Sequence, residues 1–72
     1  MTDRELLFFL RKDIEVTYKD GFKFAGHACD FEWGDDEFES SLGVRNFDPP
    51  HFIADVHPSE VASIKVIERP KK

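Results

Sequence analysis

The chain has 72 residues, enough for one domain and near the lower limit of what folds without a disulfide or metal. Its formal net charge of −5 disfavours nucleic acid as a partner, because domains that bind phosphate usually carry a basic face. The single cysteine, Cys29, excludes an intramolecular disulfide and favours a cytoplasmic setting.

A short amphipathic helix is predicted over about residues 3–10. Thr2 and Glu5 have the spacing of a capping box, and Leu6 and Phe9 follow at helical spacing. Such a short helix is marginal alone, so its apolar face is expected to pack over one open end of a barrel. The same apolar run is too short for an export signal or a membrane span, so no membrane partner is expected.

Alternating polarity predicts a hairpin of two strands. The first covers residues 13–18 and the second residues 22–29, joined at an Asp-Gly turn signal. Keeping Phe24 on the same face as the first strand's apolar residues requires a three-residue turn, with Gly21 in the left-handed region and a bulge. Gly26 in the second strand indicates a bend or a close backbone approach.

The rest of the chain predicts short strands separated by polar or proline-containing segments. Phe38, Leu42 and Val44 are expected on one face of the third strand. In order, the segments are an acidic loop over about 30–39, a strand over 38–45, a turn over 46–50, a strand over 51–56, a 3₁₀ turn over 57–60, a strand over 62–67 and a charged tail over 68–72. The fold class is therefore mainly β: one domain over residues 1–72, with a short N-terminal helix on a five-stranded antiparallel SH3/Sm-like barrel over about 13–67.

Two segments resemble the motifs of Sm-like proteins, most closely those of small bacterial members. Residues 13–26, DIEVTYKDGFKFAG, resemble the first motif: a strand, a Lys-Asp-Gly turn and a later Gly. Residues 56–64, VHPSEVASI, are similar to the second motif, in which a short turn leads into the last strand. The resemblance covers nearly the whole chain and implies a small barrel, assembly into rings and binding of single-stranded RNA.

The base-binding positions of that family differ here. Glu32 stands where the family has Asp, Asp36 where it has Asn, and His57-Pro58 where it has an Arg-Gly pair. Loss of the Arg removes a planar cation that stacks on bases, and Asp36 places an anion that repels phosphate. RNA is therefore a disfavoured partner.

The acidic loop contains the candidate site. Phe31, Trp33, Asp35, Asp36 and Glu37 are predicted to form a docking patch for a basic protein, since aromatic residues are enriched at binding hot spots. The alternative is that both aromatic side chains fold back over the barrel end. The carboxylates could also bind a divalent cation, but they lack the spacing of a calcium loop, so neither a metal nor a cofactor is predicted.

Two further groups of polar residues have the residue types of a metal site or a nucleophilic site. His51, Asp55 and His57 share a strand face, and a surface hydrogen bond between Asp55 and His57 is expected rather than a zinc site. His27 and Cys29 could pair as base and nucleophile, but no third member or oxyanion hole accompanies them.

The sequence thus predicts a non-enzymatic binding module that acts by protein–protein interaction or self-assembly. The alternatives are a divergent Sm-like RNA-binding protein and an acidic mimic of nucleic acid that occupies a basic groove. No small-molecule substrate is indicated.

Overall fold

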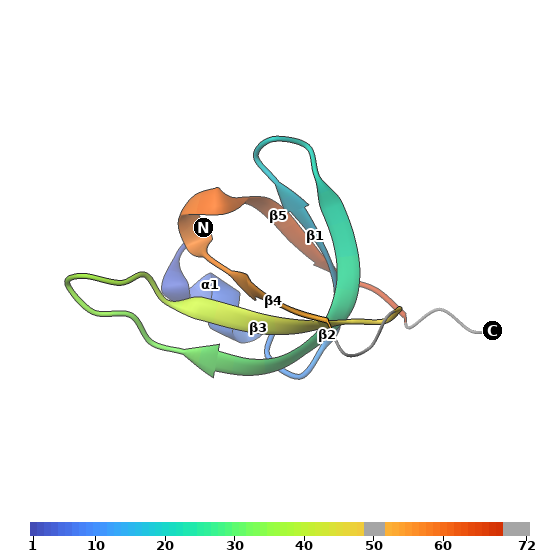
Figure 1. Ribbon diagram of the computed structural model, residues 1–72, viewed down its shortest axis with the longest axis horizontal. Coiled ribbons are helices and arrows are strands. Elements are labelled where there is room, and N and C mark those ends of the chain that lie inside the picture. Colours follow the sequence, from blue (N-terminus) through green and yellow to red (C-terminus); the bar gives the residue numbers. More distant parts are fainter. Residues whose placement is uncertain (49–51, 69–72) are drawn as a thin grey trace.

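The computed structural model describes residues 1–48 and 52–68, and these residues form a mainly β protein with one short α-helix (Figure 1). The elements are α1 (Asp3–Phe8), β1 (Asp13–Tyr18), β2 (Lys23–Glu32), β3 (Ser41–Asn46), β4 (Ile53–Val56), the 3₁₀ helix η1 (Pro58–Glu60) and β5 (Val61–Val66). No described helix is long and apolar enough to cross a bilayer. Parts of three predicted segments lie outside the described residues: the two prolines of the turn at 49 and 50, the strand start at His51 and the tail over 69–72.

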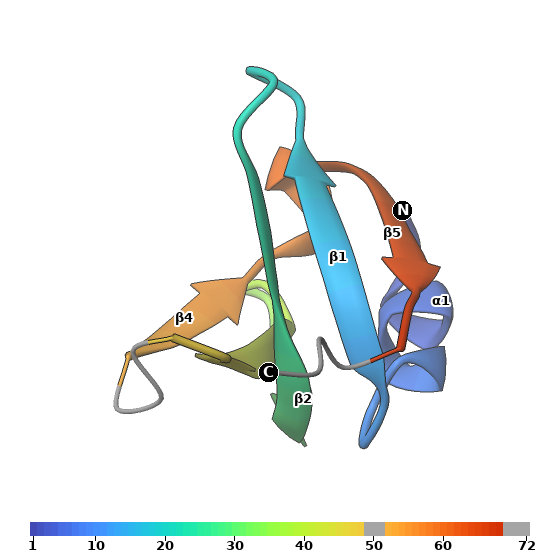
Figure 2. The same cartoon turned by 90° about the vertical axis from the view of Figure 1, so that its right-hand side faces the viewer.

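All five strands form one antiparallel sheet in the order β4-β3-β2-β1-β5. The long strand β2 pairs with β1 through its first half and with β3 through its second half, and the sheet turns sharply along it (Figure 2). Within residues 1–48 and 52–68 no pairing joins β4 to β5, so both remain edges. The antiparallel five-stranded sheet is confirmed, and it is strongly bent rather than closed into a barrel.

The β1–β2 hairpin has the three-residue turn that the alternation requires. The N–H of Tyr18 donates to the carbonyl of Phe22 at 2.8 Å, and the N–H of Gly21 donates to the carbonyl of Tyr18 at 3.0 Å. Gly21 has φ of 96°, in the left-handed region that favours glycine. The close approach expected at Gly26 is also confirmed, because a Cβ there would overlap the carbonyl oxygen of Arg45 on β3.

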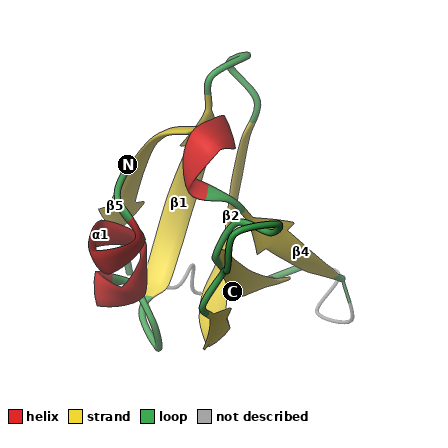
Figure 3. Ribbon diagram, turned by 90° about the vertical axis from the view of Figure 1, so that its left-hand side faces the viewer, coloured by secondary structure: helices red, strands yellow, loops and turns green. Residues whose placement is uncertain are grey.

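Helix α1 begins with the predicted capping box but ends two residues early. Thr2 and Glu5 exchange side-chain and backbone hydrogen bonds at its start. After Phe8 the backbone turns through i→i+3 hydrogen bonds, and the ammonium of Lys12 donates to the Phe8 carbonyl at 2.9 Å. Arg11 then adopts a left-handed conformation with φ of 69°, so the helix cannot continue. The helix lies beside β5, on the open side of the bent sheet (Figure 3).

A small core fills the concave side of the sheet. It consists of Leu6, Ile14, Val16, Ala28, Leu42, Val44, Val56 and Val61, each at most 2% exposed. Leu42 and Val44 share a buried face of β3 as predicted, but the placement of Phe38 on that face is wrong, because Phe38 is 70% exposed. Phe38 precedes β3, and its backbone is hydrogen-bonded to Asp35 in the preceding loop instead of to a neighbouring strand.

Candidate functional site

The loop between β2 and β3, residues 33–40, is the candidate site, and it projects from one end of the molecule (Figure 1). Its two arms are joined by hydrogen bonds. The N–H of Gly34 donates to Oγ of Ser40 at 2.8 Å, and the N–H of Asp35 donates to the carbonyl of Phe38 at 2.8 Å. Gly34 is required there, because a Cβ would overlap backbone atoms of the opposite arm. These contacts between its two arms therefore give the loop a defined conformation.

The side chain of Asp35 stabilises the turn of the loop by accepting backbone hydrogen bonds. Its Oδ1 accepts hydrogen bonds from the N–H groups of Glu37 at 2.8 Å and Phe38 at 3.0 Å. These backbone hydrogen bonds lower the pKa of Asp35 because they stabilise its charged form. The sequence placed Asp35 among the docking residues, and the structure gives it a role in the loop's own turn.

Ser40 connects the loop to the rest of the fold. The residue is 2% exposed, and its Oγ donates to Oδ2 of Asp3 at 2.9 Å while accepting the bond from Gly34. Its carbonyl oxygen lies 3.2 Å from Nδ1 of His57. No sequence pattern distinguished Ser40 from the other serines, so this buried anchor was missed.

The two predicted aromatic residues of the patch lie differently. Phe31 is half-buried and packs against the core, whereas Trp33 is 58% exposed. Their rings meet edge to face with centroids 5.0 Å apart. Folding back over the sheet therefore holds for Phe31 and not for Trp33. Phe38, which the sequence placed on a strand face with Leu42 and Val44, adds a second exposed ring to the loop.

A β-bulge at Cys29 explains why Phe31 faces inward. Ala28 pairs with Val44 and Asp30 with Gly43, so Cys29 is an extra residue on β2. Such an insertion reverses the alternation beyond it. Phe31 is thereby placed on the core side three residues after the buried Ala28.

Three carboxylates of this region face solvent: those of Glu32, Asp36 and Glu37, which are exposed. Among the described residues, none of these three carboxylates has a hydrogen-bonded or ionic partner. Glu39 differs, because its carboxylate accepts hydrogen bonds from the hydroxyl of Ser59 at 2.6 Å and from its N–H at 3.1 Å. The Ser59 side-chain and backbone hydrogen bonds lower the pKa of Glu39.

The four positions that match the base-binding residues of Sm-like proteins divide into two pairs. Glu32 and Asp36 are exposed, at the end of β2 and in the loop. His57 is hydrogen-bonded to Ser40, and Pro58 is buried at the start of η1. His57 and Pro58 thus serve the packing between the loop and η1.

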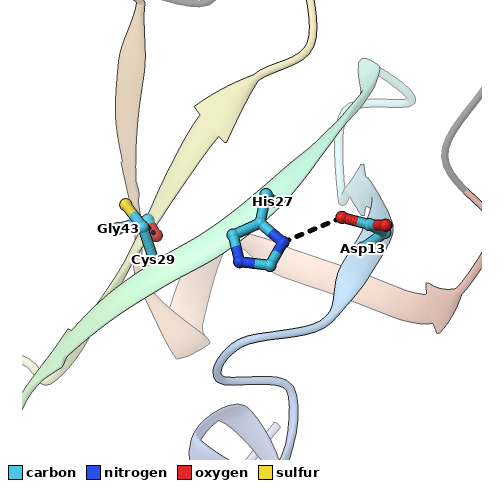
Figure 4. Close-up of polar contacts among 4 residues, drawn as sticks. All are labelled: Asp13, His27, Cys29 and Gly43. Carbon is cyan, nitrogen blue, oxygen red and sulfur yellow. Dashed lines mark hydrogen bonds and ion pairs between the residues drawn. The ribbon is translucent and has the colours of Figure 1, made fainter.

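The structure separates the other polar side chains that the sequence brought together. Nδ1 of His27 lies 2.8 Å from Oδ1 of Asp13, while the thiol of Cys29 points away toward the Gly43 carbonyl at 3.4 Å (Figure 4). The bulge separates the two side chains that simple alternation placed on one face. His57 is bonded to Ser40 rather than to the predicted Asp55, and His51 lies outside the described residues. No group of three metal-binding side chains occurs among the residues that the structure describes.

Comparison of the chain with protein-family models, with curated proteins and with solved structures finds no match. The proposal for a function therefore starts from the loop, in which exposed rings and carboxylates are carried by a backbone with internal hydrogen bonds.

Proposed function

We propose that this chain is a non-enzymatic protein-interaction module whose acidic loop, residues 33–40, docks a basic partner. The observation that carries the proposal is the exposure of Trp33 and Phe38, at 58% and 70%, on a loop with internal hydrogen bonds. Large aromatic side chains contribute strongly to binding when a partner covers them. A loop already held in shape loses less conformational freedom on binding, which favours affinity.

The charge around these rings selects the partner. Glu32, Asp36 and Glu37 present carboxylates to solvent, and the whole chain carries −5. An anionic surface with exposed rings suits a segment rich in Lys or Arg, because cations are attracted to both carboxylates and aromatic faces. The same charges would repel phosphate, so RNA binding is the weaker alternative. A protein with a basic groove that normally holds nucleic acid is another candidate partner, because its groove carries the same positive charge as a Lys/Arg-rich segment.

Trp33 is the only tryptophan of the chain, so its fluorescence reports on the loop directly. We expect a Lys/Arg-rich peptide to shift the emission to shorter wavelength and to bind less tightly as salt is raised. An acidic peptide of equal length is the control. An unchanged emission with the basic peptide at low salt would contradict the proposal.

Phe38 provides a substitution that leaves this reporter intact. Phe38→Ala is expected to weaken binding of the basic peptide about tenfold or more, as loss of a hot-spot ring does. Phe52→Ala is the matched control, because Phe52 is also exposed, at 56%, but lies outside the loop beside β4. Equal affinity of the Phe38 and Phe52 variants would exclude Phe38 from the docking surface.

Self-assembly is a second candidate, and the two unpaired sheet edges favour it. Ile53 on β4 and Val66 on β5 are 50% and 53% exposed. An edge strand with free backbone groups and an apolar side chain can pair with a strand of another chain. A relationship of the bent sheet to the Sm-like fold, whose family assembles into rings, is likewise proposed here on the motif resemblance alone.

A further inference from the structure

A second exposed aromatic surface lies on the β1–β2 hairpin. Tyr18, Phe22 and Phe24 share one face of it, because Phe22 stands opposite Tyr18 across the turn and Phe24 follows at a spacing of two. Their centroids are 5.9, 6.0 and 6.4 Å apart, and their planes differ by only 20° to 32°. Three nearly equal separations exclude a single column, so the three rings form one compact cluster with nearly parallel planes.

This aromatic face is partly open to solvent. Phe22 is 62% exposed, while Tyr18 and Phe24 are half-buried and pack against the core. The two inner rings therefore fix the position of the outer one. Among the described residues, the Phe22 ring contacts the aromatic rings of Tyr18 and Phe24 only, and most of it is exposed to solvent.

Carboxylates border the aromatic face. Glu60 lies beside Tyr18, because Tyr18 pairs with Val61 and the N–H of Lys19 donates to the carbonyl of Glu60 at 3.0 Å. Burial raises the pKa of Tyr18, and the negative charges of Glu60 and Asp20 raise it further. One oxygen of Asp20 accepts the N–H of Phe22 at 2.9 Å, which holds this carboxylate at the turn beside the ring.

The two lysines of the hairpin, Lys19 and Lys23, are exposed. Alternation places Lys23 on the opposite side of the strand from Phe22. The charge of Lys19 also helps to lower the pKa of Glu39, after the hydrogen bonds from Ser59 and the charge of His57. The face therefore combines an aromatic surface with two anions.

We propose that the Tyr18–Phe22–Phe24 face, bordered by Asp20 and Glu60, binds an arginine side chain of a basic partner protein. A guanidinium is planar and weakly hydrated, so it stacks on an aromatic ring and still donates hydrogen bonds to carboxylates at the edge. A lysine ammonium has no plane to stack and is more strongly hydrated. The surface should therefore prefer Arg to Lys, which a purely electrostatic patch would not.

This surface is separate from the acidic loop, because the hairpin and the loop project from different parts of the molecule (Figure 1). The proposal does not require the loop to bind anything. Either surface can fail its test while the other passes.

The test is a titration of the ¹⁵N-labelled full chain with a short Gly/Ser peptide that contains one Arg, and with the same peptide containing Lys. We expect the Arg peptide to shift the amide signals of residues 18–24 and of Glu60 in a saturable manner, with weaker shifts from the Lys peptide. Phe22→Leu should weaken binding of the Arg peptide about tenfold, because it keeps apolar bulk and removes the ring. Phe22→Tyr should bind as the unmodified protein does.

Glu60→Gln and Trp33→Ala complete the set. Glu60→Gln should weaken the Arg peptide severalfold and lessen its salt dependence, while Trp33→Ala should leave the hairpin shifts unchanged. The proposal is overturned by equal shifts from both peptides, by shifts confined to residues 31–39, by full binding to Phe22→Leu, or by no shifts at millimolar peptide.

Discussion

Ser40 joins segments that are distant in the sequence: the helix start at Asp3, the loop arm at Gly34 and the turn at His57. Ser40→Ala would leave the Gly34 N–H without its acceptor. We expect the free energy of unfolding to fall by about 1–3 kcal/mol, the cost of an unsatisfied polar group in a shielded place. Urea denaturation measures this change, with the exposed Ser63→Ala as control. An equal effect of both substitutions would show that the Ser40 hydroxyl contributes no more to the free energy of unfolding than an exposed hydroxyl does.

The contact between Glu39 and Ser59 predicts a dependence of stability on pH. The pKa of Glu39 is lowered in the folded protein, so its contribution is present above the ordinary Glu pKa of about 4.3. That contribution is lost as the pH falls through the lowered folded value. Ser59→Ala should therefore destabilise the protein near neutral pH, and its difference from the unmodified protein should shrink in acid. Denaturation curves at several pH values test this, and a difference independent of pH would contradict it.

At the scale of elements, β2 and β3 approach closely at one glycine and not at another. A Cβ at Gly26 would overlap the Arg45 carbonyl, whereas at Gly43 the nearest atom, Cγ of Asp30, would lie at 3.5 Å. Gly26→Ala should lower the free energy of unfolding by about 1–3 kcal/mol, the usual cost of overpacking. Gly43→Ala is the matched control and should be nearly neutral. Equal thermal stability of the two variants would contradict this account of Gly26.

The hairpin, the capping box and most of the core were predictable from the sequence, because each depends on neighbours a few residues apart. Gly21 and Gly26 indicated the turn and the close approach by residue type alone. The bulge at Cys29 was not predictable, since its position depends on how β2 pairs with a strand more than ten residues away. It reverses the alternation that had placed His27 and Cys29 on one face.

The candidate site was predictable only in part, for the same reason. Trp33 among carboxylates marked the loop, and its ring is exposed. Phe38 was assigned to the same strand face as Leu42 and Val44 because of its spacing, yet hydrogen bonds to Asp35 hold it in the loop. Ser40 carries no local signal, because its partners come from three separate segments.

At the scale of the whole molecule, the bent sheet leaves β4 and β5 as edges at opposite ends of the strand order. Pairing of one chain's β4 with another's β5 would cover both edges, so we expect the mass from light scattering to exceed that of a monomer as concentration rises. Ile53→Lys on β4 should lower that mass, because an edge lysine opposes strand pairing. Ser63→Ala, which keeps the charge of β5, is the control. A monomer at every concentration would leave docking of a different partner as the proposed function.

The hydrogen bond from Ser40 to Asp3 also affects how the protein should be handled in the laboratory. Asp3 follows Met1 by two residues, and the hydroxyl of Ser40 hydrogen-bonds both to Asp3 and to Gly34 in the acidic loop. An affinity tag fused at Met1 would therefore lie next to the proposed docking surface. Binding of basic peptides is expected to differ between a fusion protein and the same protein after the tag is cleaved.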